Sequence, residues 1–135
     1  MKKFTFMVFA AAAFALASCG KNEAIPPQLP QAADASQRIG YFASHGWEVE
    51  EISERDIIIP HEFSDIYEEY AEMQDRQGLP LREYSGRSAR LYTYEVKNYS
   101  PENMKMLAEL LVCDDKAVAS MVYSEDGGNI RMPVS

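Results

Sequence analysis

The sequence predicts an α+β fold in which two helices pack on a mostly antiparallel sheet of four to six strands. Three observations lead to this expectation. Apolar residues recur at helical spacing within residues 60–77, alternation marks residues 90–96, and two β-rich segments flank an acidic turn within residues 107–123. Helices and strands that follow one another without regular β-α-β alternation are typical of an α+β domain.

The first 18 residues are predicted to be a signal peptide and to lie outside the fold. Lys2 and Lys3 precede an apolar run, residues 4–15, that is shorter than the roughly 20 residues needed to span a bilayer. Cys19 ends a Leu-Ala-Ser-Cys segment that resembles the lipobox of bacterial lipoproteins, which implies cleavage before Cys19 and lipid on its thiol. Ordinary secretion is the alternative, because Ala-Leu-Ala at residues 15–17 also satisfies the small-x-small cleavage rule.

Residues 19–35 are predicted to be a lipid-anchored flexible tether, because Pro26, Pro27 and Pro30 break any helix and favour an extended spacer. Residues 36–135 then form a single domain. This organisation places the domain at the outer face of the cell membrane, outside the cytoplasm.

The charge of the chain argues against nucleic acid as a partner. Loss of Lys2 and Lys3 with the signal peptide leaves 11 basic and 21 acidic side chains, a net charge of −10. Nucleic-acid binding needs a basic surface, and anionic lipid headgroups also repel an acidic protein. The expected membrane partner is therefore the lipid on Cys19, not a basic protein face.

The domain is expected to begin with a helix capped by Asp34 or Ser36 and ended by Gly46. Two short strands follow, residues 47–52 and 56–59, with a turn at residues 53–55.

The second helix is predicted to run from Pro60 to about Gln77, with the carboxylates of the segment on its outer face. Its apolar stripe consists of Phe63, Ile66, Tyr67, Tyr70 and Met73. After a loop at residues 79–86, a strand over residues 90–96 puts Tyr92, Tyr94 and Val96 on one face. A strand–turn–strand unit at residues 107–123 and an edge strand at residues 130–134 complete the sheet.

Few residues suggest chemistry. His45 and His61 stand sixteen residues apart without a metal-ligand partner at helical spacing, so no metal site is predicted. Cys113 follows an apolar run and is expected to be a core thiol. Because no nucleophile elbow, phosphate-binding loop or dinucleotide fingerprint is present, neither a catalytic residue nor a cofactor is predicted.

A cluster of tyrosines and arginines is the candidate binding surface, because both residue types are enriched in recognition sites. The alternative is that Tyr92 and Tyr94 pack beneath a helix as core residues. The cluster comprises Arg82, Tyr84, Arg87, Arg90, Tyr92, Tyr94 and Tyr99.

Several segments together resemble an uncharacterised family of small Gram-positive lipoproteins and membrane-tethered domains, a domain of unknown function. The resemblance covers about residues 36–123. It rests on Gly46-Trp47-Glu48-Val49, Ile59-Pro60 with Phe63, Tyr67 and Tyr70, Gln77-Gly78, Leu81-x-x-Tyr84-x-Gly86, and Tyr92-Thr93-Tyr94-x-Val96-x-Asn98-Tyr99. The resemblance implies two strands around a short turn in the final segment, and it implies no activity.

The predicted function is a non-catalytic, extracytoplasmic lipoprotein domain that binds a protein, a peptide or a cell-wall component at the outer face of the membrane. The alternative is a carboxylate-dependent hydrolase acting on an envelope substrate, which requires two carboxyl groups facing each other in a cleft. A third possibility is a subunit of a membrane assembly.

Overall fold

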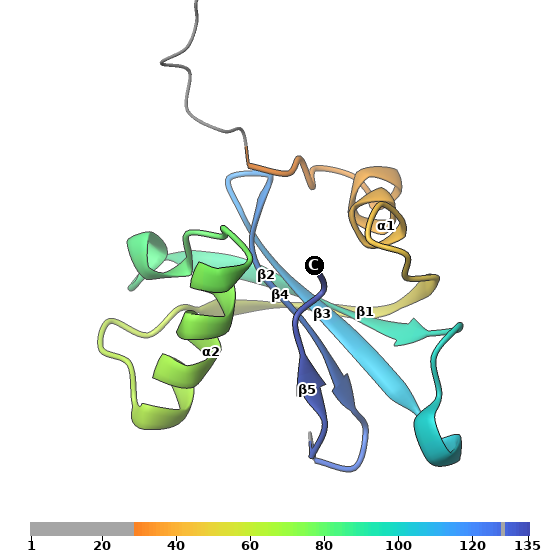
Figure 1. The fold of residues 1–135 in the computed structure, drawn as a ribbon. Helices are drawn as coiled ribbons and strands as arrows, with labels where there is room; N and C mark the ends of the chain where they lie inside the picture. Colours follow the sequence, from red (N-terminus) through yellow and green to blue (C-terminus); the bar gives the residue numbers. More distant parts are fainter. Residues whose placement is uncertain (1–28, 128) are drawn as a thin grey trace, which may run out of the picture.

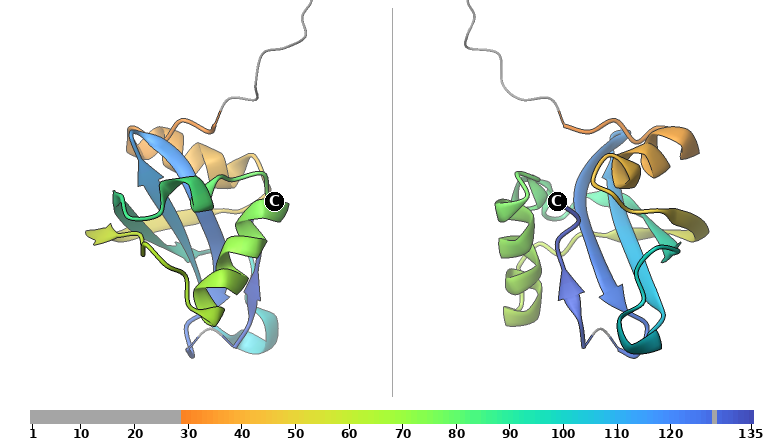
Figure 2. Two further views of the ribbon diagram at one scale, coloured as in Figure 1. Left: turned by 90° about the vertical axis from the view of Figure 1, so that its left-hand side faces the viewer. Right: turned by 45° about the vertical axis from the view of Figure 1, so that its right-hand side comes forward.

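The computed structural model describes residues 29–127 and 129–135. The predicted signal peptide, Cys19 and most of the predicted tether lie outside these residues. The described chain folds into one antiparallel sheet of five strands in the order β1-β2-β3-β4-β5, with helix α1 and helix α2 on opposite faces (Figures 1 and 2). The predicted α+β class is confirmed.

The strands are β1 Val49–Ile58, β2 Ser88–Val96, β3 Met106–Cys113, β4 Lys116–Ser124 and β5 Arg131–Met132. The helices are α1 Ala35–Ala43 and α2 Asp65–Arg76, with short 3-10 turns η2 Leu81–Tyr84 and η3 Pro101–Asn103. Successive strands are neighbours in the sheet, and α2 belongs to the connection between β1 and β2.

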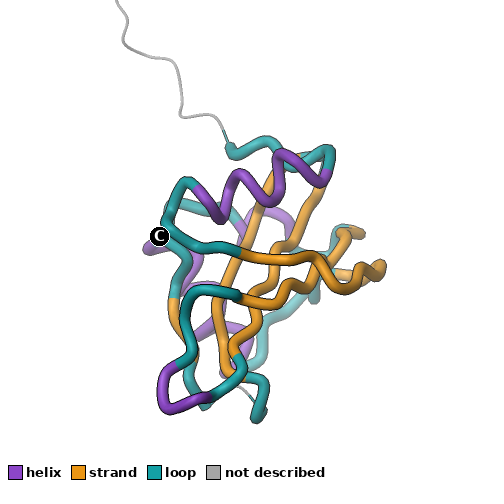
Figure 3. Tube along the Cα trace, turned by 90° about the vertical axis from the view of Figure 1, so that its right-hand side faces the viewer, coloured by secondary structure: helices purple, strands orange, loops and turns teal. Residues whose placement is uncertain are grey.

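Helix α1 begins as its sequence predicts but ends at Ala43 with Ser44 as its C-cap, before the predicted end at Gly46. The Asp34 side chain accepts a hydrogen bond from the amide of Gln37, and Gly46 adopts a φ of 89° beyond the helix end. Tyr41 and Phe42 are buried, and the Phe42 ring lies 4.8 Å from the ring of Tyr94 on β2. Figure 3 shows α1 crossing over the strands, so this face of the sheet is covered.

The α1 side of the sheet is a continuous apolar core. Alternate residues of β2 and β3 point into it, as the period of two in a strand requires. This core includes Tyr92, Tyr94, Val96, Met106, Ala108 and Leu110, all buried. Arg38 of α1 closes its margin, where its guanidinium lies 3.8 Å above the Tyr92 ring and pairs with Glu51.

Residues 49–58 form one strand, so the predicted division into two strands with a turn is wrong. Strand β1 pairs with β2 along its whole length, and the register of the pairing shifts between Glu51 and Ser53. A bulge of this kind accommodates an extra residue without ending the strand. Ser53, Glu54 and Arg55 therefore remain in the sheet.

Helix α2 starts five residues later than predicted. Ser64 caps it by accepting a hydrogen bond from the amide of Tyr67, which leaves Pro60 and His61 in the preceding loop. Ile66 is also misplaced in the predicted apolar stripe, because its side chain is 67% exposed. The residues of α2 that are fully covered are Ala71 and Gln74.

The β3–β4 turn is predicted correctly. Asp114 and Asp115 have φ values of 53° and 63°, the left-handed conformation that a two-residue hairpin turn requires and that Asp tolerates. The chain before α1 lies along this hairpin, because Ala117 donates a backbone hydrogen bond to Pro30 and Ala32 donates one to Asp115. The ordered domain therefore includes residues that the sequence assigned to the tether.

The outer edge of β4 is covered by side chains as well as by backbone. The amide of Gln74 accepts a hydrogen bond from the Ser120 N–H and donates one to the Ser120 carbonyl, both at 2.9 Å. This side chain thus occupies the place of a neighbouring strand. Beyond it, β5 pairs with Val122 and Tyr123, a shorter edge strand than the predicted 130–134.

Neither described helix is long and apolar enough to cross a membrane.

Candidate functional site

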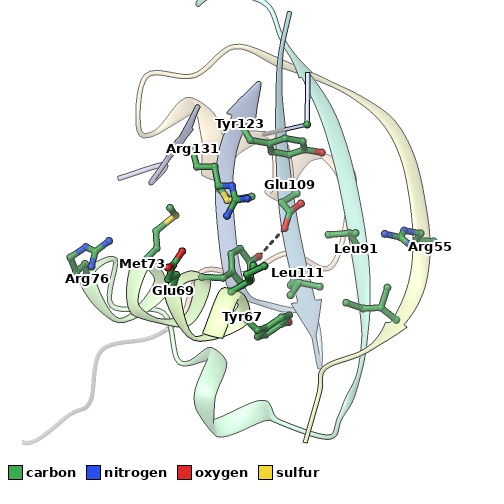
Figure 4. A pocket seen from close by; sticks show the side chains of 15 residues that line it. Arg55, Tyr67, Glu69, Met73, Arg76, Leu91, Glu109, Leu111, Tyr123 and Arg131 are labelled. Carbon is green, nitrogen blue, oxygen red and sulfur yellow. Dashed lines mark hydrogen bonds between the residues drawn. The ribbon is translucent and has the colours of Figure 1, made fainter. Parts of the chain in front are cut away.

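An open cleft of about 610 Å³ separates α2 from the sheet (Figure 4). Its volume falls in the range of about 300–1,000 Å³ that is usual for ligand pockets. The cleft is lined by side chains from α2 and from all five strands. We call it the α2 cleft. It exists because α2 covers only one end of this face of the sheet.

The register of the strands builds the floor of the α2 cleft. Beneath α2, a row of Leu91, Leu111 and Ala119 is buried. The next row runs through Thr93, Glu109 and Met121, and all three are only partly buried. The rows share one face because paired residues point the same way. The second row is therefore the surface that the cleft leaves open.

Glu109 lies at the centre of this floor, on β3. The Tyr70 hydroxyl of α2 donates a hydrogen bond of 3.0 Å to its Oε2 (Figure 4). Burial raises the pKa of Glu109, and the effect is opposed by the Tyr70 hydrogen bond and by the charge of Arg55. A partly buried carboxyl group with a perturbed pKa in a cleft is a common property of functional sites.

Three tyrosines surround this carboxylate. Tyr67 and Tyr70 come from α2, with ring centroids 5.5 Å apart, and Tyr123 comes from β4. Burial raises the pKa of each hydroxyl, and the Glu109 charge adds to the effect. The three phenols therefore stay neutral across the physiological range and keep a proton to donate.

Charged groups of both signs stand at the margins of the cleft. Arg55 of β1 and Arg131 of β5 lie on opposite sides of Glu109, while Glu69 and Arg76 project from α2 (Figure 4). All four side chains are exposed, unlike Glu109. Apolar side chains of Ile57, Ile66, Met73 and Met121 complete the lining. The cleft thus combines apolar walls with a polar centre.

The predicted tyrosine and arginine cluster does not form one surface. Tyr92 and Tyr94 are 6% and 0% exposed, in the core under α1. The core alternative is therefore correct for these two residues. Their alternation on β2 points them away from the α2 cleft.

The other members of the predicted cluster are scattered. Arg82 pairs with Glu68 and Asp75 of α2, and Arg90 pairs with Glu54 and Asp56 of β1. Arg87 pairs with Asp114 and lies 5.1 Å from the centre of the Tyr84 ring, and the Tyr99 ring contacts Trp47. None of these residues lines the α2 cleft.

The other residues considered for chemistry, Cys113, His45 and His61, are buried or pack against neighbouring residues. Cys113 is 3% exposed, and burial raises the pKa of its thiol. The His45 ring packs edge-on against Tyr41, and the His61 ring lies over Gly86. Within residues 29–127 and 129–135, no three His, Cys, Asp or Glu side chains are close enough together to hold a metal ion.

Sequence reasoning passed over Glu109. The available signal was a single charged residue inside the apolar run of β3, between Ala108 and Leu110. A carboxylate in such a run is seldom fully buried unless it has a partner. Tyr67 and Tyr70 were placed on the apolar side of α2, and the structure adds that they line a cleft there.

Comparison with known proteins gives one match. A family model described as a domain of unknown function (DUF4830) matches residues 41–127, which extends from the end of α1 to the turn after β4 and includes most of the α2 cleft. No curated protein and no solved structure matches the chain. The chain is a member of the DUF4830 family.

Proposed function

We propose that this protein is a non-catalytic binding module whose ligand site is the α2 cleft. The ligand belongs to a protein, a peptide or a cell-wall component. The observation that carries the proposal is the position of Glu109, a partly buried carboxylate at the centre of an open, mostly apolar cleft. A charge held at such a place costs stability, and proteins retain such groups mainly at functional sites.

We further propose that lipid on Cys19 holds the domain at the outer face of the membrane, as in the Gram-positive lipoproteins that the sequence resembles. The support is the lipobox-like segment before Cys19. A Cys19→Ser variant should then appear in the medium or remain as uncut precursor. If this variant stays processed and membrane-bound, the anchor proposal is wrong.

The binding proposal is tested by capture from detergent-solubilised native envelope and from isolated cell wall, with the full chain as bait. The informative variant is Met121→Trp, which places an indole on the open floor of the cleft. We expect it to lose the captured material. The matched control is Ile58→Trp on β1, where the native side chain is 63% exposed and lies outside the cleft.

Thermal unfolding of both variants must first show folded protein. Equal capture by the native chain, Met121→Trp and Ile58→Trp would place binding elsewhere on the molecule. Capture by none of them, with all three folded, would contradict a binding module for these two sources.

A carboxylate-dependent hydrolase is the second candidate. The observation that favours it is that Glu69 and Glu109 both line the cleft, and that burial raises the pKa of Glu109 as a general acid requires. Isolated cell wall and native envelope peptides are the substrates to incubate with the full chain. Release of soluble fragments that Glu109→Gln abolishes would establish this reading over the first.

A further inference from the structure

Glu109 is the charged group that lies deepest in the α2 cleft. It is partly buried, whereas Arg55, Arg76, Arg131 and Glu69 are exposed. Electrostatic attraction is stronger where water is excluded, so the floor of the cleft decides which charge a ligand brings inside. An ionised carboxylate at this place favours a positive charge on the ligand.

The carboxylate has room for further donors. Among the described residues, Tyr70 is its hydrogen-bond donor. An ionised carboxylate accepts about four hydrogen bonds. Its cross-strand neighbours, Thr93 and Met121, are likewise only partly buried, so this row of the sheet is not closed over by packing.

The tyrosines around Glu109 favour the same type of ligand. Aromatic faces attract cations, and the Tyr67, Tyr70 and Tyr123 hydroxyls stay neutral. Beyond them, Met73 and Met121 line the walls with flexible thioether side chains that adapt to an unbranched alkyl stem. The site therefore offers a carboxylate, aromatic rings and an apolar channel in one place.

The arginines at the margin do not reverse this preference. The charge of Arg55 acts on Glu109 by lowering its pKa, which opposes the larger effect of burial and favours the ionised carboxylate. An arginine at the rim can also bond to a carbonyl oxygen of a ligand whose ammonium group lies on the floor. A peptide that carries a lysine has both groups, with the backbone carbonyl at one end of the side chain and the ammonium at the other.

Resting on the proposed function, we infer that the α2 cleft takes the side chain of a lysine in a peptide, with its ammonium group on Glu109 and its alkyl stem between Met73 and Met121.

The test uses the full chain in non-ionic detergent, with 13C-labelled methionine methyl groups observed by NMR. Met73 and Met121 report on the cleft, while Met104, Met106 and Met132 lie outside its lining and serve as internal controls. The probes are acetyl-Ala-Ala-Lys-Ala-Ala-amide and the same peptide with norleucine, which keeps the stem and lacks the ammonium group. We expect the lysine peptide to shift the Met73 and Met121 methyls with about tenfold higher affinity.

The informative variant is Glu109→Gln, which keeps an acceptor for Tyr70 and removes the charge. It should bind both peptides equally. Glu72→Gln is the matched control, since it removes an exposed carboxylate of α2 that lies outside the cleft lining and should retain the lysine preference. Equal binding of the two peptides by the native chain, a preference that survives in Glu109→Gln, or no methyl shift up to about 10 mM peptide would each overturn the inference.

Acidification provides a second readout. Lowering the pH through the raised pKa of Glu109 should weaken the binding of the lysine peptide and leave the binding of the norleucine peptide unchanged. The charged or titratable groups around Glu109 are Tyr67, Glu69, Tyr70 and Arg76 of α2, Arg55 of β1, Tyr123 of β4 and Arg131 of β5. Of these, Glu69 alone is a carboxyl group, so the pH series is repeated with Glu69→Gln to separate its titration from that of Glu109.

Failure of the lysine preference leaves the proposed function standing if the norleucine peptide still moves Met73 and Met121. The proposed function fails on its own experiment, when Met121→Trp captures the same envelope material as the native chain.

Discussion

The two faces of the sheet are built from the same strands and have opposite characters. On the α1 face, Phe42 and Tyr94 are fully buried and apolar contacts continue from β2 to β4. On the α2 face, the row beneath the helix is buried, but the row that contains Glu109 is open to the cleft. One face therefore supplies most of the packing, and the other is free to carry a partly buried charge.

The difference arises from where each helix lies. Helix α1 crosses the strands, while α2 packs over the row of Leu91, Leu111 and Ala119 and contacts β4 through Gln74. The exposed second row is a consequence of that placement.

Phe42→Ala should produce the largest loss of stability, because it opens a cavity in the closed face. We expect a cost of about 3–5 kcal/mol, measured by urea unfolding. The matched change on the open face is Met73→Ala, which should cost under about 1 kcal/mol because the Met73 side chain is already partly solvated. Similar costs at the two positions would show that the faces are equally packed.

Gln74→Ala should cause the next largest loss of stability, about 2–4 kcal/mol in the free energy of unfolding. The substitution leaves the N–H of buried Ser120 without its side-chain partner, while the Ser120 carbonyl keeps its hydrogen bond from Gln77. Glu72→Ala on the exposed side of the same helix is the control and should change stability by less than about 0.5 kcal/mol. A loss for Gln74→Ala no larger than that of the control would mean that water replaces the amide at this edge.

Glu109→Gln should have the smallest effect on stability, and of opposite sign. Folding raises the pKa of Glu109. At a pH between the ordinary and the raised pKa, the folded protein therefore keeps a proton that the unfolded chain has released. The stability contributed by the protonated group is complete below the ordinary pKa and is lost as pH rises through the raised one. The variant should therefore melt higher than the native chain at about pH 7 and equally at about pH 4. A variant that melts lower at neutral pH would show that the carboxylate stabilises the fold.

Local signals were sufficient for most of the fold. Alternation placed Tyr92 and Tyr94 on one side of β2, and Asp114 and Asp115 marked a tight hairpin turn. The errors came from features that depend on partners far along the chain. The bulge after Glu51 is stable because β1 pairs with β2, and no local signal distinguishes it from a turn.

The site was harder to predict than the fold. Tyrosines and arginines that are near in sequence diverge, because neighbouring residues of a strand point to opposite faces and the intervening loops carry others away. The residues that do converge come from α2 and five strands, so Glu109 and Tyr70 meet across 39 positions of sequence. The types of the residues do not indicate which side chains, far apart in the sequence, come together in the fold.

The covered edge of β4 has a consequence for how the protein behaves when crowded. Edge strands with free backbone groups promote chain-to-chain polymerisation into fibrils. Gln74 and the segment around Pro30 occupy the β4 edge, while the opposite edge, β1, displays the charged residues Glu50, Glu51, Glu54, Arg55 and Asp56. Addition of a strand from a second copy is thus obstructed at one edge and disfavoured by charged side chains at the other, and we expect concentrated solutions of the domain to resist fibril formation.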